Sequence, residues 1–381
     1  MRIVFYAPLK PPDHLVPSGD RRMAQLLIAA CQAAGHEVEL AARFRSYEGF
    51  GEGERQARLA ALGGRLAHRL AERLAARPAA ERPRVWFTYH LYYKAPDWLG
   101  PRVAARLGIP YVVAEASVAE KRAGGLWGLA HAATVAALKR AAAVVSLNPA
   151  DEPGVSPYLG APSRHYRLKP FLDPAPYTAA RAGRDGFRAD LARAHGLPTD
   201  QPWLVAVAMM RAGDKLASYR LLAEAARRID DRRWRLLLVG DGAARDEVLA
   251  AFAPLSKRTT WLGALDGDAL AQIYAASDLF VWPAINEAYG MAILEAQACG
   301  LPVVAGRSGG VGEIVAEGLT GALVPAGDGA AFAAALRELL DDPARRAEMS
   351  RSALAKVATE HDLTAAGARL DAILRSVTST G

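Results

Sequence analysis

The sequence predicts an α/β protein built from two doubly wound, parallel-sheet domains of the Rossmann-like kind that face a central cleft. Short apolar runs alternate with helical patterns along both halves, and parallel strands need helical crossovers between them. A length of 381 residues with 51% hydrophobic side chains suits two ordinary domains and excludes a disordered chain. Three prolines within 168–177 mark the linker. We therefore predict domains at 1–168 and 169–342, and a helical tail at 343–381 that packs back on the first domain.

The first half supplies alternating strands and helices. A helix is predicted over 21–34, where Gly35 ends it, and a second, amphipathic helix over 52–78. Strands are predicted from buried apolar runs at 2–7, 36–42, 85–94, 109–117 and 141–149.

The helix predicted at 52–78 has one leucine face and one arginine face. Its leucines recur at three- and four-residue spacing: Leu59, Leu62, Leu66, Leu70 and Leu74. Its other face carries Arg55, Arg58, Arg65, Arg69, Arg73 and Arg77. Such a helix either packs its leucines on its own domain or lies on an anionic membrane, and the sequence leaves both open.

The second half repeats the alternation of strand and helix. Strands are predicted at 203–210, 234–242, 259–265, 278–284 and 301–306, with helices at 218–229 and 268–278. The pair Asp266 and Asp268 could hold Mg²⁺, but it directly precedes a helical run, where aspartate is a good cap. We favour capping and expect no metal.

Two carboxylates, Glu287 and Glu295, stand on either side of Gly290 at the start of an apolar helical run. If the helix begins there, the N–H groups of Gly290, Met291 and Ala292 have no acceptors within the helix. They form an anion site with the helix dipole behind it. One anion site between two hydroxyl-binding carboxylates fits a phosphate joined to two sugars.

Two cations, Arg211 and Lys215, follow the first strand of the second domain and bracket a short glycine loop. Fixed cations near a helix N-terminus make a strong pyrophosphate site, because charge-assisted bonds to phosphate are each worth roughly 1.5–3 kcal/mol. Charge that builds on a departing diphosphate would be stabilised there. The alternative is a surface charge cluster.

The first domain has candidates at the carboxyl ends of its predicted strands, where open α/β sheets bind ligands. Ser18 and Gly19 lie in the first loop between strand and helix, His90 follows a later strand, and Glu115 and Ser117 end another. The backbone at Ser18 and Gly19 could approach a donor, whereas His90, Glu115 and Ser117 could contact sugar or acceptor hydroxyl groups. Glu115 and His90 could also act as acid or base. A surface turn or an ion pair with a neighbouring arginine is the alternative.

The net charge of +7 is unevenly placed. Residues 1–170 hold 24 Lys and Arg against 14 Asp and Glu, whereas 171–381 hold 23 against 26. The basic half faces an anionic partner, such as a lipid surface or acceptor, or is simply solvated. Nucleic acid is disfavoured because no stacking aromatics lie among the basic residues.

Composition also suggests the cellular compartment. Cys31 and Cys299 lie in apolar stretches, which favours two reduced thiols, and no cysteine pattern suits a metal. The N-terminus is too strand-like for a signal peptide, and no run of about 18 apolar residues exists. We expect a cytoplasmic protein that can sit peripherally at the inner face of the cell membrane.

Several segments resemble the family-4 glycosyltransferases, retaining enzymes of the GT-B fold (glycosyl transferases group 1). They are NEAYGMAILEAQACGLPVV, GGVGEIV with EGLTGALVP, LLLVGDG, ALAQIYAASDLFVWPA and, near the start, GHEVEL. They cover most of the second domain and the first 40 residues. The glutamate pair with seven intervening residues is the specific feature.

The resemblance implies a UDP- or GDP-sugar donor, no metal and no cofactor. The acceptor is a polysaccharide, a lipid-linked compound or a small molecule, with cell-envelope polysaccharide as the expected product. Glu295 would hold the ribose hydroxyls, Glu287 the transferred sugar, and Arg211 and Lys215 the diphosphate, which Gly19 would approach from the other domain.

Two departures from the family pattern qualify these roles. The spacing RAGDK is tighter than the family's usual loop between Arg and Lys, so the role of Lys215 is less certain than that of Arg211. Where many members carry a histidine, this chain has Glu115, Ala116 and Ser117. Either Glu115 or Ser117 replaces that histidine near the sugar, or the sugar lies elsewhere.

Two other functions remain open from the sequence. A sugar-nucleotide 2-epimerase shares the two-domain architecture and would isomerise the donor without an acceptor. A donor-binding subunit without catalysis would bind the sugar nucleotide and release no product.

Overall fold

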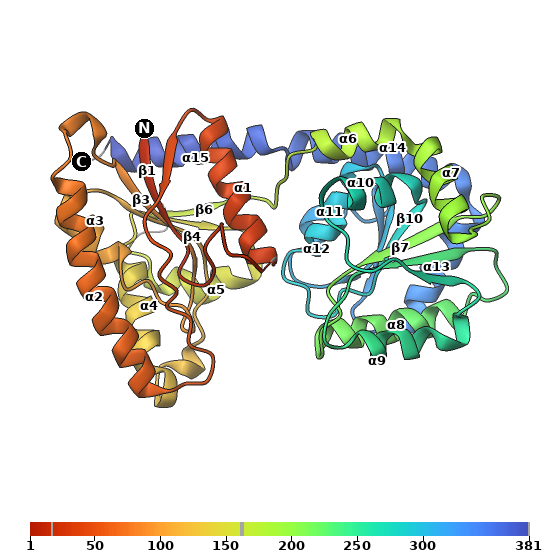
Figure 1. Ribbon diagram of the computed structural model, residues 1–381, viewed down its shortest axis with the longest axis horizontal. Helices are drawn as coiled ribbons and strands as arrows, with labels where there is room; N and C mark the ends of the chain where they lie inside the picture. The colour runs from red at the N-terminus through yellow and green to blue at the C-terminus, as the bar shows by residue number, and fades with distance from the viewer. Residues whose placement is uncertain (17, 161–163, 380–381) are drawn as a thin grey trace. The chain divides into compact units, whose positions relative to one another are not determined.

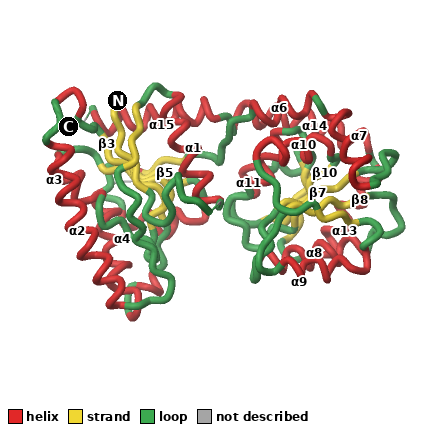
Figure 2. Tube along the Cα trace, viewed as in Figure 1, coloured by secondary structure: helices red, strands yellow, loops and turns green. Residues whose placement is uncertain are grey.

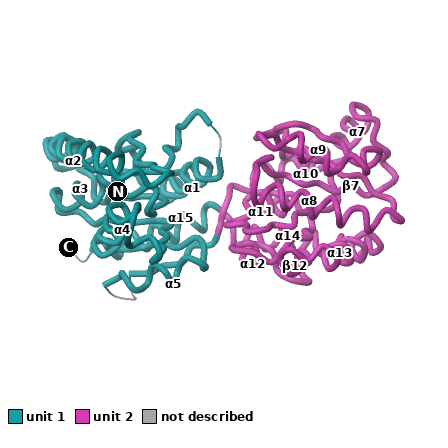
Figure 3. Tube along the Cα trace, turned by 90° about the horizontal axis from the view of Figure 1, so that it is seen from below, with its two compact units in different colours: residues 1–169, 363–381 teal, residues 170–362 magenta. Residues whose placement is uncertain are grey.

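The computed structural model describes residues 1–16, 18–160 and 164–379, and the chain divides into two compact units (Figures 1 and 3). Unit 1 comprises 1–169 and 363–381, and unit 2 comprises 170–362. Each unit has its own parallel sheet and its own hydrophobic core. In each, the strands run through the middle and helices cover them (Figure 2).

The sheet of unit 1 has six parallel strands in the order β2-β1-β3-β4-β5-β6. Their bounds are β1 Arg2–Tyr6, β2 Glu37–Leu40, β3 Val85–Leu91, β4 Tyr111–Ala116, β5 Ala143–Ser146 and β6 His165–Arg167. The chain winds one way from β1 to β2 and the other way from β3 onward. The topological switch point, where ligands bind in such sheets, therefore lies between β1 and β3.

The helices of unit 1 include two closely packed pairs. Their bounds are α1 Gly19–Ala33, α2 Gly53–Ala75, α3 Gly100–Leu107, α4 Gly128–Arg140, α5 Glu152–Val155 and α15 Leu363–Thr378. α1 packs against α15, and α2 lies beside α3 (Figure 1).

The leucine face of α2 packs largely on its own unit. Leu70 and Leu74 are buried in the unit 1 core, whereas Leu62, nearer the start, is 38% exposed. Gly63 allows close packing, because a Cβ there would lie 2.4 Å from the Cβ of Trp98. The buried leucines are therefore not free to enter a membrane, and the arginines are left on the outer surface.

The sheet of unit 2 also has six parallel strands, in the order β12-β11-β10-β7-β8-β9. Their bounds are β7 Trp203–Val207, β8 Arg235–Val239, β9 Thr259–Trp261, β10 Leu279–Trp282, β11 Val303–Arg307 and β12 Gly321–Pro325. Successive strands run outward from β7 to β9 and then outward on the other side from β10 to β12. The switch point of this unit lies between β7 and β10.

The helices of unit 2 follow the strands in regular alternation. They are α6 Ala175–Ala182, α7 Arg184–His195, α8 Asp214–Arg227, α9 Arg245–Phe252, α10 Gly267–Ala276, α11 Met291–Ala298, α12 Val311–Ile314, α13 Gly329–Asp341 and α14 Pro343–Glu360. α6 and α7 were not predicted: α6 begins inside the proline-rich stretch expected to be linker.

The segment 343–381, expected as one tail on the first domain, is divided between the units. α14 packs on α11 and α13 in unit 2, whereas α15 packs on α1 in unit 1. At the end of α14, His361 Nδ1 lies 2.6 Å from Pro170 O, and Leu172 N–H donates to His361 O at 3.0 Å. The chain therefore enters unit 2 at Pro170 and leaves it after Asp362 at neighbouring points.

The predicted α/β class with two parallel doubly wound sheets is confirmed. Most predicted elements exist, and the strands are shorter than their apolar runs suggested. Cys31 and Cys299 are free and buried, and burial raises the pKa of both thiols to about 12. No helix among the described residues is long and apolar enough to cross a membrane.

Candidate functional site

The carboxyl ends of β7 and β10 carry the residues expected to bind a donor in unit 2. These strands are neighbours and flank the switch point of the sheet. Arg211 follows β7, Lys215 lies in the first turn of α8, and Glu287 follows β10. Crossover geometry therefore brings residues more than 70 positions apart to one edge of the sheet.

Lys215 and Glu287 are paired with each other. Lys215 Nζ donates to Glu287 Oε2, and the Nε1–H of Trp282 donates to the same oxygen at 3.0 Å. The ammonium also lies 5.4 Å from the centre of the Trp282 ring, within cation–π range. The side chains of Lys215 and Glu287 are 24% and 16% exposed. The pair is partly shielded from water but remains within reach of a ligand.

The loop at 283–290, which carries Glu287, contains two residues in a strained backbone conformation. Ala284 and Asn286 have φ values of 55° and 50°, and such conformations cost side-chain-bearing residues about 1–3 kcal/mol each. Three hydrogen bonds anchor the loop: Ile285 N–H to Ser218 Oγ at 3.1 Å, Asn286 Nδ2–H to Asp214 Oδ2 at 3.0 Å, and Glu287 N–H to Ser308 Oγ at 3.0 Å.

The N-terminus of α11 offers main-chain N–H groups to an anion. The N–H groups of Ile293 and Leu294 both donate to Gly290 O, at 2.8 and 3.1 Å. Among the described residues, the N–H groups of Gly290, Met291 and Ala292 find no acceptor. This arrangement matches the geometry expected for an anion site at a helix start.

Glu295 lies one turn into α11. The hydroxyl of Tyr274 donates to Glu295 Oε2 at 3.2 Å. Burial, reinforced by the charge of Glu295, holds the pKa of Tyr274 well above its usual value. Tyr274 therefore stays a donor and orients the carboxylate at all ordinary pH values.

Arg211 is exposed, and its side chain has no ion-pair or hydrogen-bond partner within the described parts of the chain. The glycine turn at 240–242 supports its loop: Met210 N–H donates to Asp241 O at 2.9 Å, and a Cβ at Gly242 would lie 2.3 Å from Met210 O. Gly242 thus has a packing role in this turn.

The second glycine loop, 306–310, packs directly on the loop of Glu287. Gly309 has a φ of 47°, and a Cβ there would lie 2.0 Å from Glu287 O. No other residue type fits at this position without moving the backbone that carries Glu287.

In unit 1, Ser18 and Gly19 begin α1. Ser18 is its N-cap, with Oγ accepting from Arg21 N–H at 3.2 Å. A Cβ at Gly19 would meet no atom within 4 Å. Packing therefore does not require glycine there, and the backbone at Gly19 is open to a ligand.

His90 and Asp20 form a contact across the switch point of unit 1. His90 lies near the end of β3, Asp20 lies in the first turn of α1, and His90 Nδ1 is 2.9 Å from Asp20 Oδ1. His90 and Glu115, on adjacent strands, have φ values of 64° and 60°. Strain of this kind in neighbouring strands is typical of functional sites.

Carboxylates surround the imidazole of His90. Burial alone would lower the pKa of His90, but Glu115, Asp20 and Asp151 together raise it. Burial raises the pKa of Asp151, although its carboxylate accepts a hydrogen bond from Ser117. The cluster thus brings all three first-domain candidates, His90, Glu115 and Ser117, into one polar network. It can donate a proton from the imidazole and accept hydrogen bonds from hydroxyl groups.

Sequence reasoning missed Asp20, Asp151, Trp282 and Tyr274. Asp20 and Asp151 follow β1 and β5, and Trp282 ends β10, so the rule that ligands bind at strand carboxyl ends would have drawn attention to them. Tyr274 lies on a helix, where its apolar neighbours gave no such signal.

Among the described residues, no group of three or more His, Cys, Asp or Glu side chains is arranged to hold a metal ion. Asp266 lies at the N-cap position of α10, without a side-chain capping bond, and Asp268 lies in its first turn.

Comparison with known proteins gives a family match within unit 2. The family model described as glycosyl transferases group 1 matches residues 201–342. A D-inositol 3-phosphate glycosyltransferase from Pseudarthrobacter chlorophenolicus is 34% identical over 192 residues, covering 48% of this chain and 44% of that protein. A GDP-mannose-dependent phosphatidylinositol monomannoside mannosyltransferase from Corynebacterium glutamicum is 38% identical over 149 residues, 37% of this chain and 39% of its own. The chain thus matches less than half the length of these relatives.

Solved structures are similar over the whole chain. Sucrose-phosphate synthase from Thermosynechococcus elongatus has a TM-score of 0.74 at 20% identity and covers 100% of both chains. Anabaena HepE in complex with UDP has a TM-score of 0.73 at 17% identity and covers 99% of this chain and 100% of that one. These likenesses show the fold. Residues 201–342 thus match the group 1 glycosyltransferase model, and the whole chain carries the GT-B fold of two Rossmann-like domains.

Proposed function

We propose that this protein is a retaining glycosyltransferase that moves a sugar from a UDP- or GDP-sugar to a polysaccharide, a lipid-linked compound or a small molecule. The observation that carries the proposal is the cluster at the switch point of unit 2. There an unpaired arginine, a lysine–glutamate pair and the open N-terminus of α11 lie at one sheet edge. Cations and amides at one point suit a diphosphate, and the carboxylates suit hydroxyl groups.

The diphosphate is held by Arg211, Lys215 and the amides at the start of α11. As the bond between sugar and diphosphate breaks, negative charge grows on the β-phosphate, where preplaced cations and N–H groups stabilise it. Among the residues that the structure describes, Arg211 has no protein partner to give up, so its full charge is available to the donor. Lys215 must be shared with Glu287 or drawn away from it.

The two glutamates select the two sugars of the donor. Glu295, oriented by Tyr274, accepts hydrogen bonds from the ribose hydroxyls. Glu287, fixed by Trp282 and by its strained loop, accepts from hydroxyls of the transferred sugar. The pairing of Glu287 with Lys215 then links sugar recognition to diphosphate binding.

The transfer needs no nucleophile from the protein. The acceptor oxygen forms a bond to the anomeric carbon on the face that the diphosphate leaves, while the carbon–oxygen bond to the β-phosphate breaks. The leaving phosphate oxygen takes the acceptor's proton. We propose that no metal or cofactor takes part, since Arg211, Lys215 and the helix amides supply the positive charge. His90, Glu115 and Ser117 contact the sugar or the acceptor.

We also propose cytoplasmic action with peripheral contact to an anionic membrane through unit 1, in cell-envelope polysaccharide synthesis. Phe50 and Leu126 are 80% and 70% exposed on touching loops, since a Cβ at Gly51 would lie 2.9 Å from that of Leu126. Gln56 in α2 donates to Leu126 O at 2.8 Å, which ties these apolar tips to the start of the basic helix. Apolar tips beside basic charge suit an anionic lipid surface. The wholly buried thiols suit a reducing compartment.

The test begins with a thermal-shift screen of UDP- and GDP-sugars, followed by analysis of products from the donor that binds. Wild-type protein is expected to release free nucleotide slowly without acceptor. Arg211→Ala is expected to lower kcat by about a hundredfold, because it removes stabilisation of the leaving group. Arg220→Ala is the matched control, since Arg220 is exposed on α8 and pairs with Glu247.

The outcomes separate the alternatives. An isomerised sugar nucleotide without acceptor would indicate an epimerase, and donor binding without any nucleotide release would indicate a non-catalytic subunit. Equal activity of Arg211→Ala and Arg220→Ala would contradict the site assignment.

A further inference from the structure

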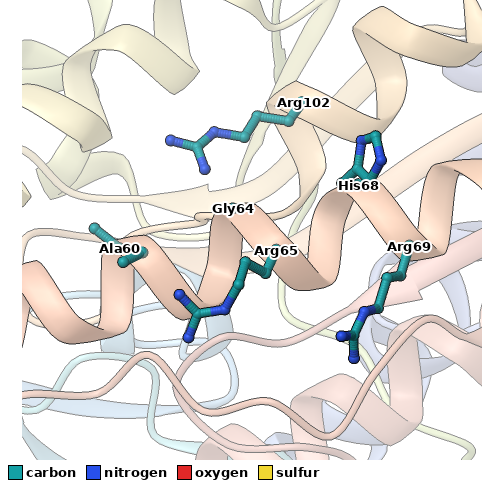
Figure 4. Close-up of a pocket in the computed structure, with 7 residues that line it drawn as sticks. Ala60, Gly64, Arg65, His68, Arg69 and Arg102 are labelled. Carbon is teal, nitrogen blue, oxygen red and sulfur yellow. The ribbon is translucent and has the colours of Figure 1, made fainter.

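A basic pocket lies on the outer surface of unit 1, between α2 and α3 (Figure 4). It has a volume of about 610 Å³ and is lined by Ala60, Ala61, Gly64, Arg65, His68, Arg69 and Arg102. Arg65, His68 and Arg69 come from α2, and Arg102 comes from α3 and extends alongside α2 near Gly64 (Figure 4). The candidate donor site lies in unit 2, so this pocket is a separate feature.

The arginines of this pocket are not neutralised by the protein. Within the described parts of the chain, the side chains of Arg65, Arg69 and Arg102 have no ion pair or hydrogen bond. No carboxylate lines the pocket. Just beyond the end of α2, by contrast, Arg77 makes an ion pair with Glu39 at 2.8 Å. Three guanidinium groups without a counter-charge around one hollow favour a bound anion.

A glycine inside α2 shapes the pocket. Gly64 lies in the interior of a 23-residue helix, where glycine is less favourable than alanine. A Cβ at Gly64 would lie 2.3 Å from Arg102 Nη1. Because Gly64 has no side chain, the Arg102 guanidinium lies directly against the α2 backbone at Gly64. The pocket is thus formed by packing as well as by charge.

His68 is part of the wall and is already occupied. Its Nδ1 lies 2.6 Å from Arg106 Nη1, and its Nε2 lies 3.0 Å from a carboxylate oxygen of Glu72. The candidate binding groups of the pocket are therefore the three arginines. The small side chains of Ala60 and Ala61 form the rest of its lining.

We propose that this pocket binds a phosphoryl group, carried by an anionic lipid headgroup or by a soluble phosphate compound. A guanidinium presents paired N–H donors that match phosphate oxygens, and more than one arginine suits the double charge of a phosphomonoester. A monocarboxylate would leave most of this positive charge unbalanced. The inference does not rest on the proposed transferase reaction, because the pocket shares no residue with the donor site.

The test compares two triple variants of the full chain. The pocket variant is Arg65→Gln, Arg69→Gln, Arg102→Gln. The control variant removes the same charge from exposed arginines elsewhere: Arg140→Gln, Arg227→Gln, Arg351→Gln. Binding of inorganic pyrophosphate is measured by calorimetry with Arg211→Ala added throughout, so that the candidate donor site contributes little. Binding of vesicles with and without phosphatidylglycerol is measured by sedimentation at about 0.15 M salt.

We expect each pocket arginine to contribute about threefold to tenfold in affinity, so the pocket triple loses most binding and the control triple little. Loss in the vesicle arm alone identifies a lipid headgroup, and loss in the pyrophosphate arm identifies a soluble phosphate; either supports the site. Equal losses in the two triples, or no binding of either probe by the unsubstituted protein, would overturn it.

Gly64→Ala separates pocket geometry from general charge. It keeps every charge and suits a helix interior, but its methyl group displaces the Arg102 guanidinium. We expect binding to weaken about threefold, as one charge-assisted contact is disturbed. Binding unchanged by Gly64→Ala would refute a built site. Similar thermal unfolding of all variants is expected, since none loses an ion pair within the described chain.

Discussion

The pairing of Lys215 with Glu287 predicts that removing the glutamate charge strengthens binding of the nucleoside diphosphate. In Glu287→Gln the side chain keeps its shape and can still accept from Trp282 N–H, while the ammonium loses its carboxylate. The pair is 24% and 16% exposed, between the exposed case of about 0–1 kcal/mol and the buried case of about 3–5 kcal/mol. We take about 1–2 kcal/mol as the attraction that the diphosphate must overcome.

That free energy corresponds to a roughly five- to thirtyfold gain in affinity for UDP or GDP, whichever the wild type binds. The assay is calorimetric titration of wild type and Glu287→Gln, repeated in a Lys215→Met background. With no ammonium to release, that background is expected to show no gain. Sugar transfer is expected to fall at the same time, since the carboxylate no longer accepts from the sugar hydroxyls. Weaker or unchanged diphosphate binding in Glu287→Gln, or the same gain without the lysine, would refute the reasoning.

Three other variants test the remaining assignments. Glu295→Gln is expected to raise the donor KM about tenfold with a smaller change in kcat. The reason is that it weakens hydrogen bonds to the ribose hydroxyls, which are made equally in the bound state and in the transition state. A change in kcat alone would contradict a role in binding the ribose. Glu115→Gln is expected to lower the pKa of His90, measured by NMR titration, because Glu115 is the charge that raises this pKa most. Since the folded-state pKa of His90 is raised, its contribution to stability is complete below about pH 6.5 and is lost as the pH rises through the folded-state pKa. Glu115→Gln should therefore make the unfolding free energy less dependent on pH. An unchanged pKa of His90 would refute the interaction between His90 and Glu115. Gly309→Ala is expected to cost about 2 kcal/mol of unfolding free energy and most activity, because of its positive φ and the main-chain oxygen 2.0 Å from the new Cβ. Gly312→Ala, which meets nothing within 4 Å, is the control, and equal stability of the two would contradict the packing argument.

Local patterns predicted the structure around the Glu287 loop well. The apolar run before Pro283, the position of Gly290 and the helical run after it placed a strand, a turn and a helix where β10 and α11 lie. Each of these signals acts within a few residues: strand burial gives an unbroken apolar run, and glycine tolerates the φ of 74° found at Gly290.

The helix α7 shows why part of unit 2 was missed. It has no fully buried residue, so no strong apolar stripe identifies it. Its place depends on Arg184 and Arg188, which both pair with Asp278, about 90 positions later, at 2.5 and 3.0 Å. Ion pairs over such distances leave no periodic signal, because either partner alone resembles an ordinary surface charge.

The sequence by itself determined the α/β class, the two sheets and the strand ends at which the candidate ligand-binding residues lie, because strand and helix periodicity and helix-start chemistry are properties of neighbouring residues. Only the tertiary structure decided which of those residues meet. It paired Lys215 with Glu287, set Asp20 against His90 and divided the C-terminal helices between the two units. These contacts join residues about 70 or more positions apart, and the order of strands in each sheet, which no local pattern encodes, brings such residues together.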